Sequence, residues 1–427
     1  MMPAATMTWF WKVWLAAVVF VFPIPHTIAL RNLLLAIGIG ALLWTSRTSL
    51  PRPAPWLKPA AWWLLALTAW IVFHSAAVAP EPTLALDQFR ANWLMPLLLG
   101  ALAAWAATQL PREETARAAA IALAAHMIWL LGWQSAIGFD TGSWPFKKTP
   151  FGAYDYHGTL NSFFLALLLT DRLVWTMRRY SPLAFGRRSG WALLCLSLIS
   201  DLALQSRNST VISLSLLLLA CLVLLNGQSR QRNIAAAAIG LVMLLGVGTL
   251  SFDSRWQSLR ESSFVGWSSP STYWMAADNS TQPVTPSGAP LETSAYLRAA
   301  WARKSLDFIA EHPLGIGFGH DAFGRAIALK HGHAGLGSSH SGWLDFALGT
   351  GLPGLALLLA AAGIAIRDGW KQFRDRQDAQ ALLLAFFVGG YLLRCLLDGH
   401  LSGWRLGLFA FIIGVLLAGM KNPRTDS

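Results

Sequence analysis

The sequence predicts an all-α polytopic membrane protein, with about twelve transmembrane helices around one large extracytoplasmic segment. Three observations lead to this fold class. Of 427 residues, 55% are hydrophobic and only 13% are charged, whereas a soluble domain carries roughly 25% charged residues. The 22 tryptophans are of the type that gathers at membrane–water interfaces. The basic residues stand in short clusters between long apolar runs, as topology signals do.

Apolar runs that can cross a membrane recur along the whole chain. About 20 apolar residues span the ~30 Å hydrocarbon core. The candidate runs are 9–29, 31–46, 60–79, 92–109, 115–137, 158–177, 190–206, 208–226, 233–250, 343–366, 379–397 and 402–420. These twelve runs are an even number, so both chain ends are expected on one side.

The charges between the runs predict the orientation, because cytoplasmic loops of membrane proteins are rich in Lys and Arg. With both termini in the cytoplasm, every basic cluster falls on the inner side, for example at 178–188 and 367–376. Basic loops also flank the stretch 190–226, which must therefore cross twice. The chain is expected to turn near Gln205–Asn208 at the outer face.

The chain divides into three predicted regions. Residues 1–250 form the first nine transmembrane helices, 251–342 the outer segment, and 343–427 the last three helices and a cytoplasmic tail. In the outer segment, apolar residues recur at helical spacing, which predicts an amphipathic helix from Glu292 to Glu311, and Pro313 ends it. The Ser/Thr/Pro/Gly-rich part 267–290 is predicted to be a loop. A second, shorter outer loop is expected at 139–157.

Several function classes are disfavoured. The net charge of +12 is scattered over short loops, so no continuous basic face for nucleic acid is expected. The outer loops hold no close carboxylate pair for Mg²⁺ or Mn²⁺, so neither a metal nor a cofactor is expected. The glycines of Pro313–Gly319 lack the Lys-Ser/Thr and the preceding strand of a phosphate loop. They predict tight turns instead.

Three residues are candidates for chemistry at the outer face. Arg207 follows the predicted turn, and it either binds an anion or extends to lipid headgroups. Arg298 lies on the predicted amphipathic helix, as an anion contact or as a solvated cation. His340 lies where the outer segment re-enters the membrane. It either accepts a proton from a hydroxyl at neutral pH or caps the next helix.

In chain order, these residues and their neighbours resemble the superfamily of O-antigen ligases and O-antigen polymerases. Gln205-Ser206-Arg207 comes first, Arg298, Trp301 and the segment 311–319 follow, and His340 comes last. The most specific element is His340-Ser341, nine residues, Gly351, two residues and Gly354, which is similar to the ligase signature. The motifs cover roughly 190–366, and the topology covers the whole chain.

The resemblance implies a GT-C-like membrane glycosyltransferase of lipopolysaccharide biosynthesis, in the inner membrane, with its active site on the periplasmic face. It would transfer a preassembled O-antigen glycan from undecaprenyl pyrophosphate to a sugar hydroxyl of lipid A–core. The transfer would invert the anomeric carbon and need neither metal nor nucleotide sugar. The implied partners are these two substrates and the membrane lipids.

The resemblance also implies roles for the candidates. Arg207 and Arg298 would neutralise the pyrophosphate as it leaves, and His340 would be the general base. Arg90, at the outer start of its helix, is a further candidate anion contact. Asp398, in the last outer loop, is a candidate for orienting a histidine or a sugar.

Two alternatives stay open. An O-antigen polymerase would use the same donor with a growing glycan as acceptor, and Lys147 and Lys148 could supply its second basic site. A transporter of lipid-linked glycans would be expected to carry charges at the bilayer midplane or broken inverted-repeat helices. The sequence shows neither of these two transporter features, since the ionisable residues gather toward the outer face.

Overall fold

The computed structural model describes residues 4–45, 57–225, 228–229, 231–233, 235–240, 254–268, 273–276, 283–286, 288, 291–332 and 336–420. Within these ranges the regular elements are helices, which confirms the all-α prediction. Their bounds are α1 Ala4–Val21, α2 Ile28–Thr45, α3 Lys58–Ala77, α4 Pro82–Phe89, α5 Met95–Ala107, α6 Arg112–Thr141, α7 Tyr154–Arg178, α8 Arg187–Leu204, α9 Arg207–Leu225, α11 Ser254–Ser268, α12 Tyr273–Ala276, α13 Thr293–Glu311, α14 Ala322–His331, α15 Gly342–Arg376, α16 Ala379–Leu397 and α17 Gly403–Ala418.

Six of the described helices are long and apolar enough to cross a membrane: α3, α6, α7, α9, α15 and α16. Helices α1, α2 and α17 are apolar over a shorter length. A π-helical turn, Arg90–Leu94, joins α4 to α5, so the predicted span 92–109 is the end of a longer helical stretch. Most of the predicted span 233–250 lies outside the described residues. The structure thus supports a helical membrane protein, and the count of twelve spans stays a prediction.

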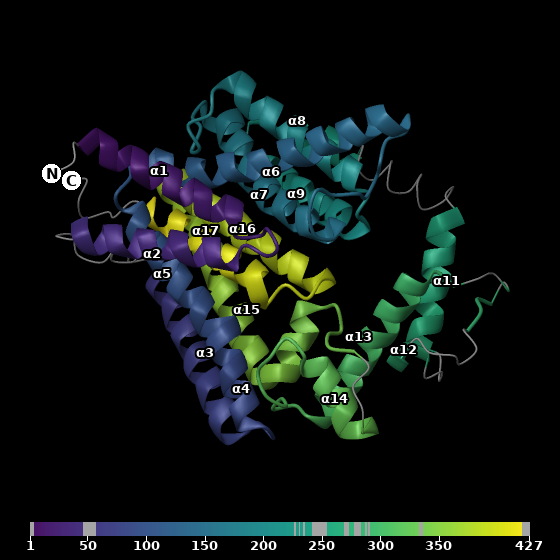
Figure 1. Ribbon diagram of the computed structural model, residues 1–427. Coiled ribbons are helices and arrows are strands. Elements are labelled where there is room, and N and C mark those ends of the chain that lie inside the picture. Colours follow the sequence, from purple (N-terminus) through teal and green to yellow (C-terminus); the bar gives the residue numbers. More distant parts are fainter. Residues whose placement is uncertain are drawn as a thin grey trace.

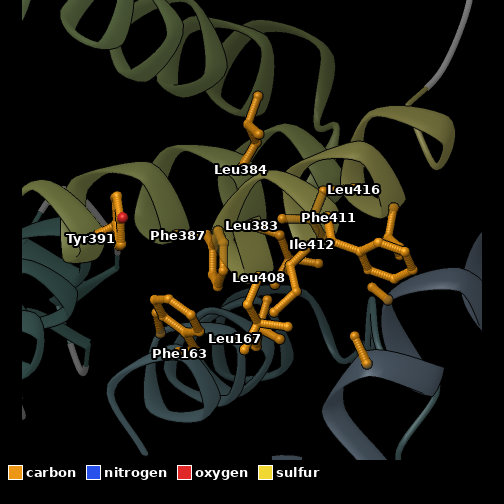
Figure 2. Packing of buried hydrophobic residues seen from close by; sticks show 14 of the residues in the cluster. Phe163, Leu167, Leu383, Leu384, Phe387, Tyr391, Leu408, Phe411, Ile412 and Leu416 are labelled. Atoms are coloured by element: carbon orange, nitrogen blue, oxygen red, sulfur yellow. The ribbon is translucent and has the colours of Figure 1, made fainter. Parts of the chain in front are cut away.

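The core lies where α16 and α17 pack with α7, and Figure 2 shows side chains from all three helices meeting there. The rings of Phe163 and Phe387 lie 5.1 Å apart, and Tyr391 stacks on Phe409 at 3.8 Å. In the same bundle, α17 packs along α5, and α15 packs along both α16 and α3. This packing fixes the helix ends from which the site is built.

Helices α11 to α14 gather at one end of the bundle (Figure 1). The predicted amphipathic helix is confirmed as α13. The carboxylate of Glu292 caps it by accepting from the Ala295 N–H at 2.7 Å, and the helix ends two residues before Pro313. Helix α11, which the sequence reasoning did not identify, packs along α13. Most of the predicted loop 267–290 lies outside the described residues.

The loop between α6 and α7, which was predicted to lie on the outer side, is shorter than predicted. Helix α6 continues to Thr141 and ends at Gly142, whose φ of 70° is left-handed. Helix α7 begins at Tyr154, so the loop covers 142–153 instead of 139–157. The difference arises because helix propensity extends past the apolar run, and a glycine sets the end.

The glycine-rich segment after α13 turns tightly, as predicted, and docks on a kink in α15. Gly315 and Gly317 have φ of 89° and 113°. The N–H groups of Ile316 and Gly317 donate to the carbonyls of Leu348 and Gly349 at 2.9 and 3.1 Å. The kink lies at Gly351, whose φ is 74°. This backbone contact ties the segment 313–319 to the helix that follows His340.

Candidate functional site

The predicted turn at Gln205–Asn208 is confirmed, and it presents Arg207. Helix α8 ends at Leu204, Gln205 takes the left-handed conformation with φ of 44°, and α9 begins at Arg207. The Arg207 guanidinium lies 3.0 Å from the Glu292 carboxylate at the start of α13, and its side chain is half exposed. It is therefore held near α13 and stays accessible to a ligand.

Arg298 projects from α13 toward the end of α16. Its Nη1 donates to the Leu397 carbonyl at 3.3 Å, and its Nη2 lies 3.8 Å from Asp398 Oδ1. The side chain is partly exposed. Two cations predicted from separate motifs, Arg207 and Arg298, thus line one cavity.

Asp398 connects three polar side chains at the end of α16. Asn208 Nδ2 donates to its Oδ1 at 2.8 Å, and Arg394 Nε lies 3.0 Å from its Oδ2. Arg394 also donates to Ser209 Oγ at 2.9 Å. Asp398 and Arg394 are buried. The carboxylate therefore positions the arginines, and its predicted role in orienting a histidine or a sugar stays a prediction.

His340 is held by the loop that opens α15. Its backbone is left-handed, with φ of 59°, and its ring stacks on Trp301 with centroids 5.1 Å apart. Asp345, in the first turn of α15, fixes this loop. Its carboxylate accepts from Ser338 Oγ at 2.8 Å and from the Ser339 N–H at 2.9 Å.

The surroundings of His340 favour the neutral imidazole. Partial burial lowers the pKa of His340 below its ordinary value, and the positive charge of Arg298 lowers it further. The negative charges of Asp398 and Asp155 raise this pKa. The positive charge of Arg405 lowers it, as that of Arg298 does. A neutral ring at pH 7 has a free lone pair for a proton, which a general base requires.

Two cavities meet at His340. The larger one, of about 800 Å³, is lined by the cationic side chains of Lys147, Arg207, Arg298 and Arg394 and by apolar side chains such as Val211, Leu306, Leu344, Leu352 and Leu355. The smaller one, of about 280 Å³, has a larger share of polar groups in its wall, among them Ser338, Ser402, His320, His400 and Arg405. Asp155, His340 and Asp398 line both. The larger cavity can hold an anionic head with an apolar chain, and the smaller one a compact polar group.

Of the predicted residues, Arg207, Arg298, His340 and Asp398 come together in this site, and Arg90 does not. Arg90 is exposed, pairs with Asp87 at 3.5 Å, and lines neither cavity. Sequence reasoning missed Arg394, although a cation inside the apolar run 379–397 is itself a signal of function. It also missed the pair formed by Asp155 and Arg405.

In the described ranges, no three His, Cys, Asp or Glu side chains cluster as a metal site would require. Metal independence remains a prediction, because it concerns activity.

The long apolar helices around a partly buried, cation-lined site define a helical membrane protein. Residues 192–359 match the family model described as O-antigen ligase, and this segment belongs to that family, as its motifs predicted. No curated protein matched the chain. The family implies an activity of the membrane glycosyltransferase kind, with lipid-linked O-antigen and lipid A–core as its general substrates. The match includes Arg207, Arg298, His340, Gly351 and Gly354, and it excludes Asp155, Arg394, Asp398 and Arg405.

Proposed function

We propose that the protein is an O-antigen ligase that transfers a preassembled O-antigen glycan from undecaprenyl pyrophosphate to a sugar hydroxyl of lipid A–core. One observation carries the proposal: His340 lies where a cationic, partly apolar cavity meets a small polar one. A glycosyl transfer between two membrane-anchored substrates needs a base at the point where donor and acceptor meet.

The larger cavity suits the donor. Arg207 and Arg298 approach from α9 and α13, and their guanidinium groups offer paired N–H donors to phosphate oxygens. The apolar wall suits the lipid chain. As the glycosidic bond breaks, negative charge grows on the leaving pyrophosphate, so fixed cations stabilise the transition state more than the bound donor. Both contacts of Arg298, with Leu397 and Asp398, restrict its position.

The reaction then proceeds in one displacement. A ring nitrogen of His340 accepts the proton of the acceptor hydroxyl, and the hydroxyl oxygen attacks the anomeric carbon from the face opposite the pyrophosphate. The bond from that carbon to the phosphate oxygen breaks, undecaprenyl pyrophosphate leaves with the bonding electrons, and the anomeric configuration inverts. Neither a metal nor a cofactor takes part in this scheme. The active site would face the periplasm, with both termini in the cytoplasm, as the charges of the loops predict.

The position of Lys147 favours ligase over polymerase. A polymerase holds two pyrophosphate-linked glycans and needs two anion sites. Lys147 lines the same cavity as Arg207 and Arg298, so it enlarges one cationic site and supplies no second one. In the smaller cavity, Arg405 is paired with Asp155. The two cavities therefore match one anionic donor and one acceptor without a pyrophosphate.

The test is reconstitution in proteoliposomes with undecaprenyl-pyrophosphate-linked long glycan and lipid A–core as sole acceptor. A glycan-bearing lipopolysaccharide that forms with the wild type and not with His340→Ala is the expected result. If that mixture stays inert while single repeat units on undecaprenyl pyrophosphate lengthen, the protein is the polymerase.

A further inference from the structure

The smaller cavity contains groups that the transfer reaction does not use. Its wall combines Arg405, His320, Ser402 and His400 with the rings of Phe318 and Phe346. Arg405 and His400 lie outside the segment that matches the ligase family. Its volume of about 280 Å³ lies just below the range of ligand cavities, which begins near 300 Å³, so it suits a single ring and no larger group.

The charges of this cavity are already matched. Arg405 Nη2 contacts the Asp155 carboxylate, and Asp398 is offset by Arg394 and Arg298. Asp345 is satisfied by the Ser338 hydroxyl and the Ser339 N–H. Among the described residues that line this cavity, Arg405 is the one Lys or Arg and Asp155 pairs with it, whereas four Lys and Arg side chains line the larger cavity. The cavity therefore selects an uncharged group.

His400 supplies a fixed hydrogen-bond acceptor. The Thr159 hydroxyl donates to the Asp155 carbonyl at 2.9 Å, so its oxygen accepts from His400 Nε2 at 2.6 Å. The proton of this buried ring is therefore on Nε2, and Nδ1 keeps a lone pair. Burial lowers the pKa of His400 well below its ordinary value, so the ring stays neutral.

Three buried polar atoms of the lining residues have no hydrogen-bond partner within the described part of the chain: Nδ1 of His400, Nε of Arg405 and Oδ2 of Asp398, which the Arg394 ion pair alone approaches. Nδ1 of His400 and Oδ2 of Asp398 are acceptors, and Nε of Arg405 is a donor. A buried polar atom without a partner is costly unless a ligand or water satisfies it. Hydroxyl groups both donate and accept, and the apolar side chains of Phe318 and Phe346 in the wall suit the C–H groups of a sugar.

We infer that the smaller cavity is a subsite for one uncharged pyranose ring of a reacting glycan, bound through its hydroxyls by the Asp155–Arg405 pair and by His400. This inference rests on the proposed function, which makes the bound sugar part of a substrate. It adds a selectivity to that function: neutral hexoses are accepted, and phosphorylated or acidic sugars are rejected.

Binding of free sugars tests the subsite without any transfer reaction. Saturation-transfer NMR on the purified full-length protein would compare methyl hexosides with hexose phosphates and methyl uronosides. The neutral hexosides should bind at least fivefold more tightly than the charged sugars. Ser402→Leu places a larger side chain in the cavity wall and should weaken hexoside binding at least tenfold. Ser268→Leu, at an exposed serine outside both cavities, should leave it unchanged.

A second variant covers the case in which Ser402→Leu fails to fold. The double substitution Asp155→Asn with Arg405→Gln removes both charged hydroxyl partners without leaving either charge unpaired, and it should also weaken hexoside binding at least fivefold. The subsite is wrong if a folded Ser402→Leu protein and the double variant both bind hexosides as tightly as the wild type. It is also wrong if the charged sugars bind more tightly than the neutral hexosides. Because this readout needs no donor, it is independent of whether lipid A–core is the acceptor.

Kinetics then identify which substrate carries the ring. In the proteoliposome assay, a raised KM for lipid A–core with unchanged KM for the donor in the double variant assigns the subsite to the acceptor. The reverse assigns it to the first sugar of the donor. If neither KM changes, the cavity does not bind a reacting sugar and the inference is wrong.

Discussion

Arg394 and Asp398 form a buried ion pair at the end of α16, with 3.0 Å between Nε and Oδ2. The Arg394 side chain has no solvent-exposed surface. The same carboxylate lies 3.8 Å from Arg298 and accepts from Asn208. This pair therefore links α9, α13 and α16 in the wall of the larger cavity. Through Asp398 it also holds Arg298, which is predicted to bind phosphate.

Breaking this pair should destabilise the protein strongly. Arg394→Leu leaves the Asp398 carboxylate buried without its closest cation, and removing one partner of a buried pair costs about 3–5 kcal/mol. Arg394→Leu with Asp398→Leu removes both charges and should recover most of that loss. Thermal unfolding in detergent measures both. Arg374→Leu, at an exposed arginine paired with Asp375, is the matched control and should unfold like the wild type. Equal stability of Arg394→Leu and the control would contradict the structural role.

The two cavity arginines should be needed as arginines. Arg207→Ala and Arg298→Ala should each lower kcat by about 100-fold or more, because each removes a preorganised cation from the leaving pyrophosphate. Lysine at either position should recover little, since it has no planar fork for two phosphate oxygens. Initial rates with lipid-linked glycan and lipid A–core measure this.

Arg90 provides the comparison for these variants. It lines neither cavity, so Arg90→Ala should lose much less activity than Arg298→Ala. A loss as large as that of Arg298→Ala would mean that Arg90 reaches the donor in the complex, as the sequence first suggested, and that the free site differs from the loaded one.

Part of the site follows from the sequence because its signals are local. The turn at Gln205, the helix of Arg298 and the position of His340 before α15 each depend on residues within a few positions of one another. The bounds of α16 agree with the apolar run 379–397 because Asp378 caps its first turn and the apolar residues end at Leu397. Such helix boundaries are determined by the residues next to them in the sequence.

The rest depends on contacts between distant segments. Asp155 and Arg405 are 250 positions apart, and each alone resembles an ordinary charge at a helix start. The kink at Gly351 is understood only once the segment 313–319 docks on it. Arg394 did carry a local signal, a cation inside an apolar run. Its role can be assigned only from its contacts with Asp398 and Ser209.

The rate should depend on pH through His340. Burial and Arg298 disfavour the imidazolium and lower the pKa of His340. The base is active when neutral, so the acid limb of log kcat/KM should have its midpoint below the ordinary histidine value of about 6.5. Arg298→Gln removes one cation, which raises the pKa and should move the limb to higher pH. Single-turnover rates between pH 4.5 and 8, at about half-unit steps, measure both. A limb that moves to lower pH in Arg298→Gln would exclude His340 as the titrating base.

Transfer should continue without a metal. The proposed displacement uses Arg207 and Arg298 where many transferases use a divalent ion, so excess EDTA should leave the initial rate within about twofold. The control is the same reaction with EDTA neutralised by added Mg²⁺. Loss of transfer on chelation that Mg²⁺ or Mn²⁺ restores would mean that a metal completes the site.

The contact between the glycine-rich segment and α15 should tolerate no side chain. A Cβ at Gly351 would lie 2.4 Å from the Leu314 carbonyl carbon, and the residue's φ is 74°. Gly351→Ala should therefore separate the segment 313–319 from the kink, at a cost of about 1–3 kcal/mol for the backbone strain alone. Because α15 begins two residues after His340, transfer should fall with stability. Gly363→Ala, on the same helix with open space around its Cβ, is the matched control and should be neutral or slightly stabilising. Thermal unfolding and transfer rates of the two variants measure the difference. If both alanines behave alike, the docking contact does not hold the His340 loop in place, and the spacing from His340 to Gly351 has another cause.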